Sequence, residues 1–407
     1  MIDPAAHEAR RGFAAAAAQV REYDEDEPGS DVVTTVLAAP VEDPPPPAPV
    51  PQPVPAPPVA VADEPVAVAD EPVAAEPELA PRRERSSAAL TAGAERGRRR
   101  HASQGWQGAI RRLTFGALSP APGADEVAEV TDSRAVRSRW QGPKTVVIAN
   151  PKGAAGKTPT TLGLAATFGT ARGGNVLAWD NNETLGTLGL RVAAVEFPAT
   201  AVDLLEAIET FERRQARRGD LAQLVRAQES GNFHVLASDE DSARMSQIDA
   251  AAFGRLHHVL ERYYDVLAID TGNNPRAANF LAALDVADAL VIPLSWAEDK
   301  VVTAGRLIDQ LRQLGHGELV ERAVTVVTGQ PGTQTTPQQI AGWSEWFSEQ
   351  TAALVSIPWD RHLAGGGPIT YTDLRPATRR AYLTAAAAVA EQFTAAEGAA
   401  RTEGEQH

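Results

Sequence analysis

One stretch, from Lys144 to Thr161, constrains the fold more than any other part of the chain: KTVVIANPKGAAGKTPTT. Residues 146–148 form a short β-branched apolar run, which is typical of a strand buried on both faces. A loop of small residues follows, and then an Ala/Leu-rich helical pattern. This order of strand, loop and helix, with Lys157 and Thr158 at the junction, predicts a phosphate-binding loop.

The predicted loop has chemistry that suits a polyphosphate. Its backbone N–H groups would point inward, and the helix N-terminus would add positive potential. We expect Lys157 to neutralise the β- and γ-phosphates and Thr158 to offer its hydroxyl to Mg²⁺. A small-residue loop without any ligand is the alternative interpretation. The predicted nucleotide-binding residues are Lys152, Gly153, Ala154, Ala155, Gly156, Lys157, Thr158 and Pro159.

The loop departs from the common GxxxxGK[ST] pattern, because Pro151 takes the first Gly position and Lys152 precedes Gly153. It resembles the deviant Walker A loop of the ParA/MinD ATPases, usually KGGxGK[ST]. The resemblance implies ATP and Mg²⁺ as cofactors and a homodimer formed with ATP, in which Lys152 reaches the partner's nucleotide. Ala154 stands where the family usually has Gly, and Ala tolerates a positive φ poorly.

A carboxylate also closes a second apolar strand. Asp270 ends the run 265–270, DVLAID, and resembles a Walker B aspartate. Its expected role is to hold Mg²⁺ through water. The predicted metal ligands are therefore Thr158 and Asp270.

A third strand, 175–180, ends at Asp180 and leads into a motif that resembles the family's second acidic motif. The second Asp of that motif is Asn182 here. An amide orients water but cannot accept its proton, so the resemblance implies an ATPase with slow hydrolysis. The adjacent Glu183 is expected to point elsewhere if 180–182 stays extended. The predicted catalytic residues are Lys152, Lys157, Asp180 and Asn182.

Strand and helix patterns alternate over a predicted ATPase domain at 140–396. Such alternation predicts an α/β fold of the P-loop NTPase class, with a mostly parallel sheet and helices on both faces. Ligands then bind at the C-terminal ends of the strands, where the loop and both aspartates fall. Further strands are predicted at 233–237, 289–293, 323–327 and 354–357, and helices at 201–213, 243–264 and from 376 towards 396.

The composition of residues 1–139 is different and predicts a long disordered region. The Pro-rich segment 40–81 has the composition of a disordered or polyproline-like spacer. Residues 1–81 carry 3 basic and 16 acidic side chains, whereas the Arg-rich segment 82–112 carries nine Arg and two Glu. This arm is predicted to bind a protein partner. An acidic partner, nucleic acid or an anionic membrane surface would each suit the Arg-rich segment, and a solvated tether is the alternative. The tail 397–407 is also expected to be disordered.

The resemblance extends over most of 144–395, and IPWDRHLAGGGPI at 357–369 resembles the family's purine-side segment. With GWxxxIRRLT in the arm, the chain most resembles the MinD-like ATPases of actinobacterial type VII secretion loci. The resemblance implies an ATP-dependent switch or positioning factor for such a machine. A DNA-partition ATPase and a non-hydrolysing nucleotide-bound scaffold are the alternatives.

Charge and composition exclude several other classes. The net charge of -15 disfavours nucleic-acid binding, although Arg375, Arg379 and Arg380 form a local basic group that keeps it open. The absence of Cys excludes disulfides and thiolate chemistry. No apolar run reaches membrane-spanning length, so we expect no transmembrane segment and a cytoplasmic protein. Peripheral association with a membrane or the nucleoid is the alternative.

Overall fold

The computed structural model describes residues 113, 123–183, 186–193, 199–213, 216–332 and 334–404. The expected Pro-rich spacer and Arg-rich segment lie outside the described residues. The disorder expected for these two segments therefore stays a prediction.

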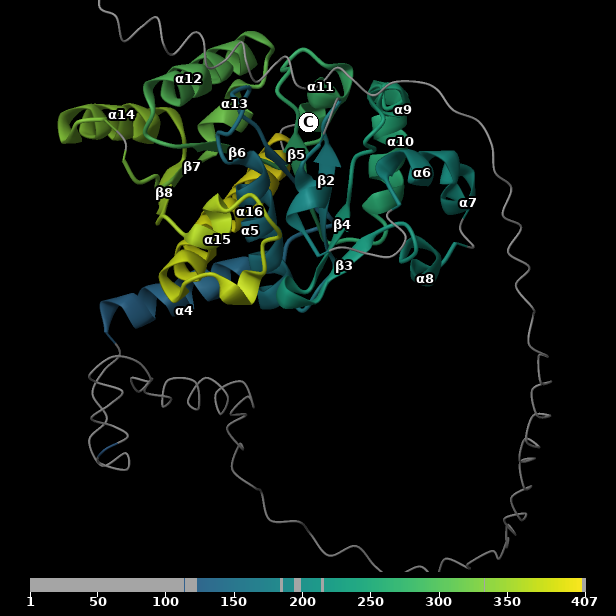
Figure 1. Ribbon diagram of the computed structural model, residues 1–407, viewed down its shortest axis with the longest axis horizontal. Helices are drawn as coiled ribbons and strands as arrows, with labels where there is room; N and C mark the ends of the chain where they lie inside the picture. Colours follow the sequence, from purple (N-terminus) through teal and green to yellow (C-terminus); the bar gives the residue numbers. More distant parts are fainter. Residues whose placement is uncertain are drawn as a thin grey trace, which may run out of the picture. The chain divides into compact units, whose positions relative to one another are not determined.

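The described chain is built around one eight-stranded sheet with the order β3-β4-β2-β5-β1-β6-β7-β8 (Figure 1). Every strand pair is parallel except β3 with β4. This confirms the predicted α/β fold with a mostly parallel sheet. The strands are β1 Lys144–Ile148, β2 Val176–Asn181, β3 Arg226–Gln228, β4 Phe233–Leu236, β5 Val266–Thr271, β6 Ala289–Leu294, β7 Val324–Thr328 and β8 Ala353–Ile357.

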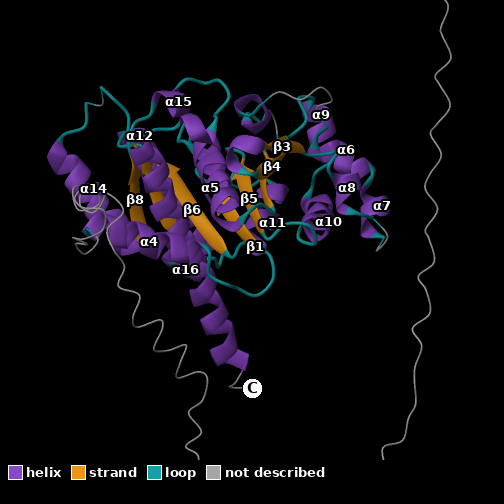
Figure 2. Ribbon diagram, turned by 90° about the horizontal axis from the view of Figure 1, so that it is seen from below, coloured by secondary structure: helices purple, strands orange, loops and turns teal. Residues whose placement is uncertain are grey.

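Helices flank the sheet on both sides, and α16 extends well past it towards the C-terminus (Figure 2). No helix in the described ranges combines the length and the apolar character needed to cross a membrane. The α-helices are α4 Ala124–Val136, α5 Lys157–Arg172, α6 Ala201–Glu206, α7 Ile208–Glu212, α8 Arg218–Leu221, α9 Ser242–Met245, α10 Ala250–Leu260, α11 Ala278–Asp285, α12 Glu298–Gln313, α13 Gly317–Glu321, α14 Pro337–Gln350, α15 Arg361–Ala364 and α16 Pro376–Gly404.

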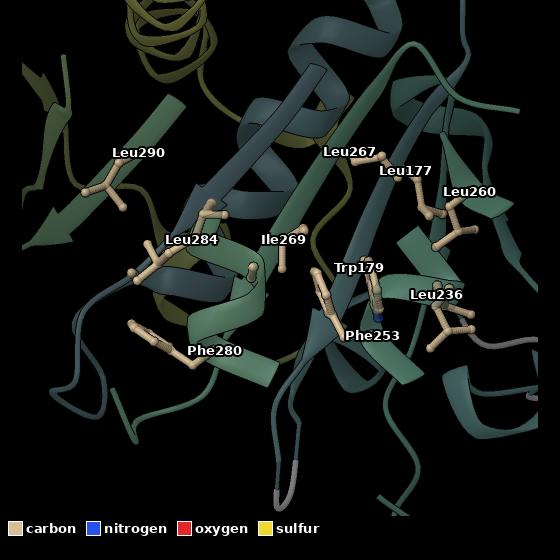
Figure 3. Packing of buried hydrophobic residues seen from close by; sticks show 14 of the residues in the cluster. Leu177, Trp179, Leu236, Phe253, Leu260, Leu267, Ile269, Phe280, Leu284 and Leu290 are labelled. Carbon is tan, nitrogen blue, oxygen red and sulfur yellow. The ribbon is translucent and has the colours of Figure 1, made fainter. Parts of the chain in front are cut away.

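The central strands are buried on both faces, as their continuous apolar runs predict. Successive side chains of β1 enter different cores: Val146 and Ile148 pack with α5 and α16, whereas Val147 packs with α10 to α12. In the core that contains Val147, Trp179 of β2 stacks on Phe253 of α10 with ring centroids 4.7 Å apart (Figure 3). The sheet is thus held by one core on each face.

Three elements differ from the sequence expectation. The helix expected at 201–213 is divided into α6 and α7. The helix expected at 243–264 is divided into α9 and α10. Asp249 caps the start of α10 by accepting a hydrogen bond from the Ala252 N–H at 2.8 Å. The antiparallel β3 was not predicted. Before residue 140, α4 packs on α16, and Arg380 donates to Asp132 of α4 at 2.7 Å.

The contact of α5 with α16 predicts opposite effects for one substitution at two helical glycines. A Cβ at Gly163 of α5 would lie 2.3 Å from the fully buried Tyr382 ring, whereas a Cβ at Gly342 of α14 meets nothing within 4 Å. Gly163→Ala is therefore expected to lower the free energy of unfolding by about 1–3 kcal/mol through overpacking.

Gly342→Ala is the matched control and should raise the same free energy by roughly 0.5–1 kcal/mol, because Ala favours a helix interior. Thermal unfolding of both variants measures the difference. Equal shifts of the two melting temperatures would contradict the packing described here.

Candidate functional site

The loop between β1 and α5 is fixed by one buried amide. Asn150 donates through Nδ2 to the Pro293 carbonyl of β6 at 2.8 Å, and its Oδ1 accepts from the Lys152 N–H at 2.9 Å. Sequence reasoning did not single out Asn150. An Asn directly after a buried strand is a common pattern, so it does not indicate a role in the loop. Its hydrogen-bond partner also lies 143 residues away in the sequence. Asn150 thus anchors the loop to the neighbouring strand.

Two residues of the loop have left-handed backbone. Gly156, the residue before α5, has φ 97°, which only glycine adopts readily. Ala154 has φ 57°, so the position usually occupied by Gly in the family has left-handed backbone here, at the cost of strain at its Cβ. The Ala therefore does not prevent a left-handed turn of the loop.

Lys157 begins α5 and turns its ammonium group back across the loop. Its Nζ donates to the Asn150 carbonyl at 2.8 Å and to Asn273 Oδ1 at 2.7 Å. Burial lowers the pKa of Lys157, and the negative charges of Asp270, Glu183 and Asp180 oppose that shift. Both present acceptors are neutral, so the cation has no anion in hydrogen-bond contact within the described chain.

Thr158 and Asp270 meet beside this lysine. The hydroxyl of Thr158 donates to Asp270 Oδ2 at 2.6 Å. The other oxygen, Asp270 Oδ1, is buried and has no hydrogen-bond partner in the described chain. Carboxylate and hydroxyl oxygens are the ligands that Mg²⁺ prefers, and an orphaned buried oxygen is a place for a cation. The pair therefore fits the predicted magnesium site.

Asp180 lies opposite Asp270 on the neighbouring strand. It accepts from Ser238 Oγ at 3.1 Å, from the Leu188 N–H at 3.1 Å and from the Asn182 N–H at 3.3 Å. Burial raises the pKa of Asp180 to about 6. Burial and the charge of Asp180 raise the pKa of Asp270 to about 7. Two adjacent buried carboxylates thus resist ionisation together.

The expectation that Glu183 points elsewhere depended on an extended 180–182, and that condition is not met. The strand β2 ends at Asn181 and the chain bends at Glu183. Its carboxylate therefore crosses to Gly272, where a Cβ would lie 1.8 Å from Glu183 Oε2. The alternation argument failed because it assumed a strand that continues past its actual end.

Lys152 lies outside the pocket of its own chain. Its Nζ forms an ion pair with Asp299 of α12 at 3.1 Å, and the two side chains are 43% and 56% exposed. Exposed ion pairs of this kind contribute little to stability. This partner could not be predicted from the sequence, because Asp299 lies at the start of a helix almost 150 residues further along the chain.

The loop between β1 and α5 and the neighbouring strand ends border a cavity of about 500 Å³. Residues 153–159, Asn182 and Asp270 line it, whereas Lys152 and Asp180 do not. On the far side Trp359, Asp360 and Leu363 contribute, so the segment compared above with a purine-side segment does reach the cavity. Polar lining residues that sequence reasoning missed are Thr187, Arg191, Thr271, Asn273, Ser295, Lys300, Thr328 and Gln330.

The buried aspartates predict a pH-dependent stability. Their folded pKa values lie above the ordinary value of about 4, so between about pH 4 and pH 7 the folded state binds more protons than the unfolded chain. Stability without ligand therefore falls as the pH rises through this window. Asp270→Asn removes one ionisable group and is expected to raise the unfolding midpoint at pH 8 but not at pH 4.

Asp309→Asn on the exposed side of α12 is the control, and it should change neither midpoint. Chemical denaturation at the two pH values measures the effect. A gain from Asp270→Asn that is the same at both would count against the shifted carboxylates.

Known proteins support the same fold. The described fold is similar to that of the ParA family ATPase from Chlorobium tepidum TLS, with 16% identity, a TM-score of 0.50, and coverage of 60% of this chain and 98% of that one. The cell-division ATPase MinD from Pyrococcus furiosus has 18% identity and a TM-score of 0.48 and covers 61% of this chain and 98% of its own. No family model matches the chain.

Among curated proteins, the ESX-1 secretion-associated protein EspI of Mycobacterium tuberculosis, in strains CDC 1551 / Oshkosh and ATCC 25618 / H37Rv, is 28% identical over 294 residues. The match covers 71% of this chain but only 42% of the relatives' length. The resemblance inferred from the loop is confirmed at this level. The chain thus has a fold similar to that of a ParA family ATPase and a sequence similar to part of an ESX-1 secretion-associated protein.

Proposed function

We propose that the chain binds Mg·ATP, dimerises around it and hydrolyses it slowly, as a switch or positioning factor for a type VII secretion machine. The observation that carries this proposal is the convergence of Lys157, Thr158 and Asp270 on one cavity beside a left-handed glycine loop. Its volume of about 500 Å³ suits a ligand of nucleotide size. The fold similarity to a ParA family ATPase supports the same reaction class.

Each site residue receives a role from its present contacts. Lys157 would exchange its two neutral acceptors for charged phosphate oxygens, which form stronger hydrogen bonds. Thr158 and Asp270 would hold Mg²⁺, which supplies neutralisation of phosphate charge. The N–H groups of residues 153–156 would cradle the phosphates, and Trp359 would border the base.

Dimerisation is proposed from Lys152. Its ammonium group is exposed and bonded to Asp299 rather than turned into its own cavity. Because such a pair is weak, ATP in a partner subunit can compete for the lysine. The ion pair with Asp299 is then the resting position of Lys152 in the monomer.

Slow hydrolysis is proposed from Asn182, which lines the cavity at the position where the family has a carboxylate. An amide cannot take a proton from water. A scaffold that binds ATP without any turnover is the neighbouring alternative, and single-turnover measurements distinguish the two.

The cellular role is proposed from the relatives. They are named for ESX-1 secretion, and this chain matches less than half of their length. We therefore propose that the cytoplasmic domain at 140–396 acts on the secretion machine through a protein partner of the N-terminal arm. Peripheral association with a membrane remains the alternative mode of recruitment.

DNA partition is the weaker candidate, because the basic group that suggested it is engaged within the chain. Arg380 donates to Asp132 at 2.7 Å, Arg379 donates to the Thr372 carbonyl at 2.6 Å, and Arg375 lies over the Trp359 ring at 5.4 Å. Binding to phosphates would have to break these contacts.

The nucleotide role of Lys157 is tested by Lys157→Ala. We expect Mg·ATP affinity to fall at least about tenfold, because a hydrogen bond to a charged group contributes about 1.5–3 kcal/mol. Calorimetric titration measures it, with the exposed Arg306→Ala on α12 as the control for lost positive charge. Wild-type affinity in the Lys157 variant would falsify the phosphate-loop assignment.

The dimer is tested by Lys152→Ala. Light scattering of the wild type should show the mass of a dimer with Mg·ATP and that of a monomer without it. The variant should bind ATP with nearly unchanged affinity but form fewer dimers, since Lys152 lies outside its own cavity. Asp299→Asn, which only releases the lysine, should not weaken the dimer. A wild type whose mass does not respond to ATP would contradict the proposal.

A further inference from the structure

The carboxylate of Glu183 lies at the end of a strand other than the one that Glu183 follows. Glu183 follows β2, yet its carboxylate lies against Gly272, directly after β5. A Cβ on Gly272 would lie 1.8 Å from Glu183 Oε2 and 2.9 Å from Oε1. The carboxylate thus fills the space that any side chain at position 272 would need.

The position is costly without a further partner. Glu183 Oε2 is buried and has no hydrogen-bond partner in the described chain. A buried polar atom without a partner lowers the stability of the fold, and more so when it is charged. The negative charge of Glu183 acts on Lys157, where it opposes the lowering of the lysine pKa by burial. A buried carboxylate oxygen without a partner, whose charge acts on the phosphate-loop lysine, needs an explanation.

The neighbouring acidic groups are already committed. Asp180 accepts from three donors, and Asp270 accepts from Thr158 and belongs to the proposed magnesium site. Asn182 has no carboxylate. Of the carboxylates whose charges act on Lys157, Glu183 is therefore the one with an oxygen that serves neither a donor nor the proposed magnesium site.

We propose that Glu183 supplies the carboxylate that Asn182 lacks and accepts the proton of the water that attacks ATP. This rests on the proposed nucleotide function. The water oxygen forms a bond to the terminal phosphorus, and the bond from that phosphorus to the bridging oxygen breaks, its electron pair leaving with ADP. The proton released by the water passes to Glu183 and from there to solvent.

Slow basal turnover follows from the position of this carboxylate. Glu183 is absent from the cavity lining, and its Oε2 is covered next to Gly272. The side chain has to move past Gly272 into the cavity before it can reach a water there.

The test compares Glu183→Gln with the wild type under single turnover at saturating Mg·ATP. The amide keeps the size of the side chain but cannot accept a proton. Turnover should fall at least about tenfold, since general-base assistance typically contributes 10²–10⁴-fold. ATP affinity by calorimetry should stay nearly unchanged, and the melting temperature should not fall, because the variant removes a buried charge without a hydrogen-bond partner. Glu318→Gln on the exposed side of α13 is the matched control and should leave turnover and affinity unchanged.

Two further variants separate a catalytic from a structural role. Adding Asn182→Asp to Glu183→Gln should restore part of the turnover, because it returns a carboxylate to the site. Gly272→Ala should lower turnover in the wild type by displacing Glu183, and should have little effect in the Glu183→Gln background. Gly272→Ala also keeps the test decisive if Glu183→Gln folds poorly.

The outcomes are distinguishable. A wild type that fails to bind Mg·ATP overturns the proposed function together with this inference. A wild type that binds ATP without turning it over overturns the proposed hydrolysis together with this inference, whereas a Glu183→Gln variant with wild-type turnover overturns the inference alone. Reduced turnover with unchanged affinity, rescued by Asn182→Asp, supports it.

Discussion

Parallel pairing of β1, β5 and β2 determines where every group of the site can lie. In register, Ile148 pairs with Asp270, and Asp270 pairs with Asp180, so three strand ends stop at one level of the sheet. The phosphate loop, the Thr158–Asp270 hydrogen bond and the Glu183 carboxylate all start from this level. A one-residue slip of β5 would turn Asp270 to the other face and separate it from Thr158.

The same geometry brings together ionisable groups that lack hydrogen-bond partners of opposite charge in the described chain. Asp180 and Asp270 are buried side by side, Glu183 has an unpaired oxygen, and Lys157 donates only to neutral groups. Buried charges without partners lower the stability of a fold, so their presence here indicates a functional role. Phosphates would pair with the Lys157 cation, and a divalent cation would pair with the carboxylates. The proposed ligand, Mg·ATP, would therefore neutralise charges of both signs.

Much of this architecture could be predicted from the sequence, because its signals are local. The strands 233–236 and 289–294 and the strand-loop-helix unit around Lys157 are encoded by short runs of neighbouring residues. The remainder depends on partners that are distant in the chain. The ion pair of Lys152 with Asp299 and the approach of Glu183 to Gly272 involve no periodicity. The antiparallel β3, only three residues long, is stabilised by pairing with β4 rather than by its own composition.

The tryptophans provide a last consequence, an optical one. Trp179 is fully buried in the core, and Trp296 and Trp343 stack on each other with centroids 6.3 Å apart, so these indoles report on the fold. Trp359 alone among the described tryptophans belongs to the cavity wall, 38% exposed and next to Arg375. Anything that enters the cavity changes the solvent and the cation around that one ring. The protein therefore contains an intrinsic fluorophore in the wall of the proposed nucleotide site, and occupancy of that cavity can be followed without attaching a label.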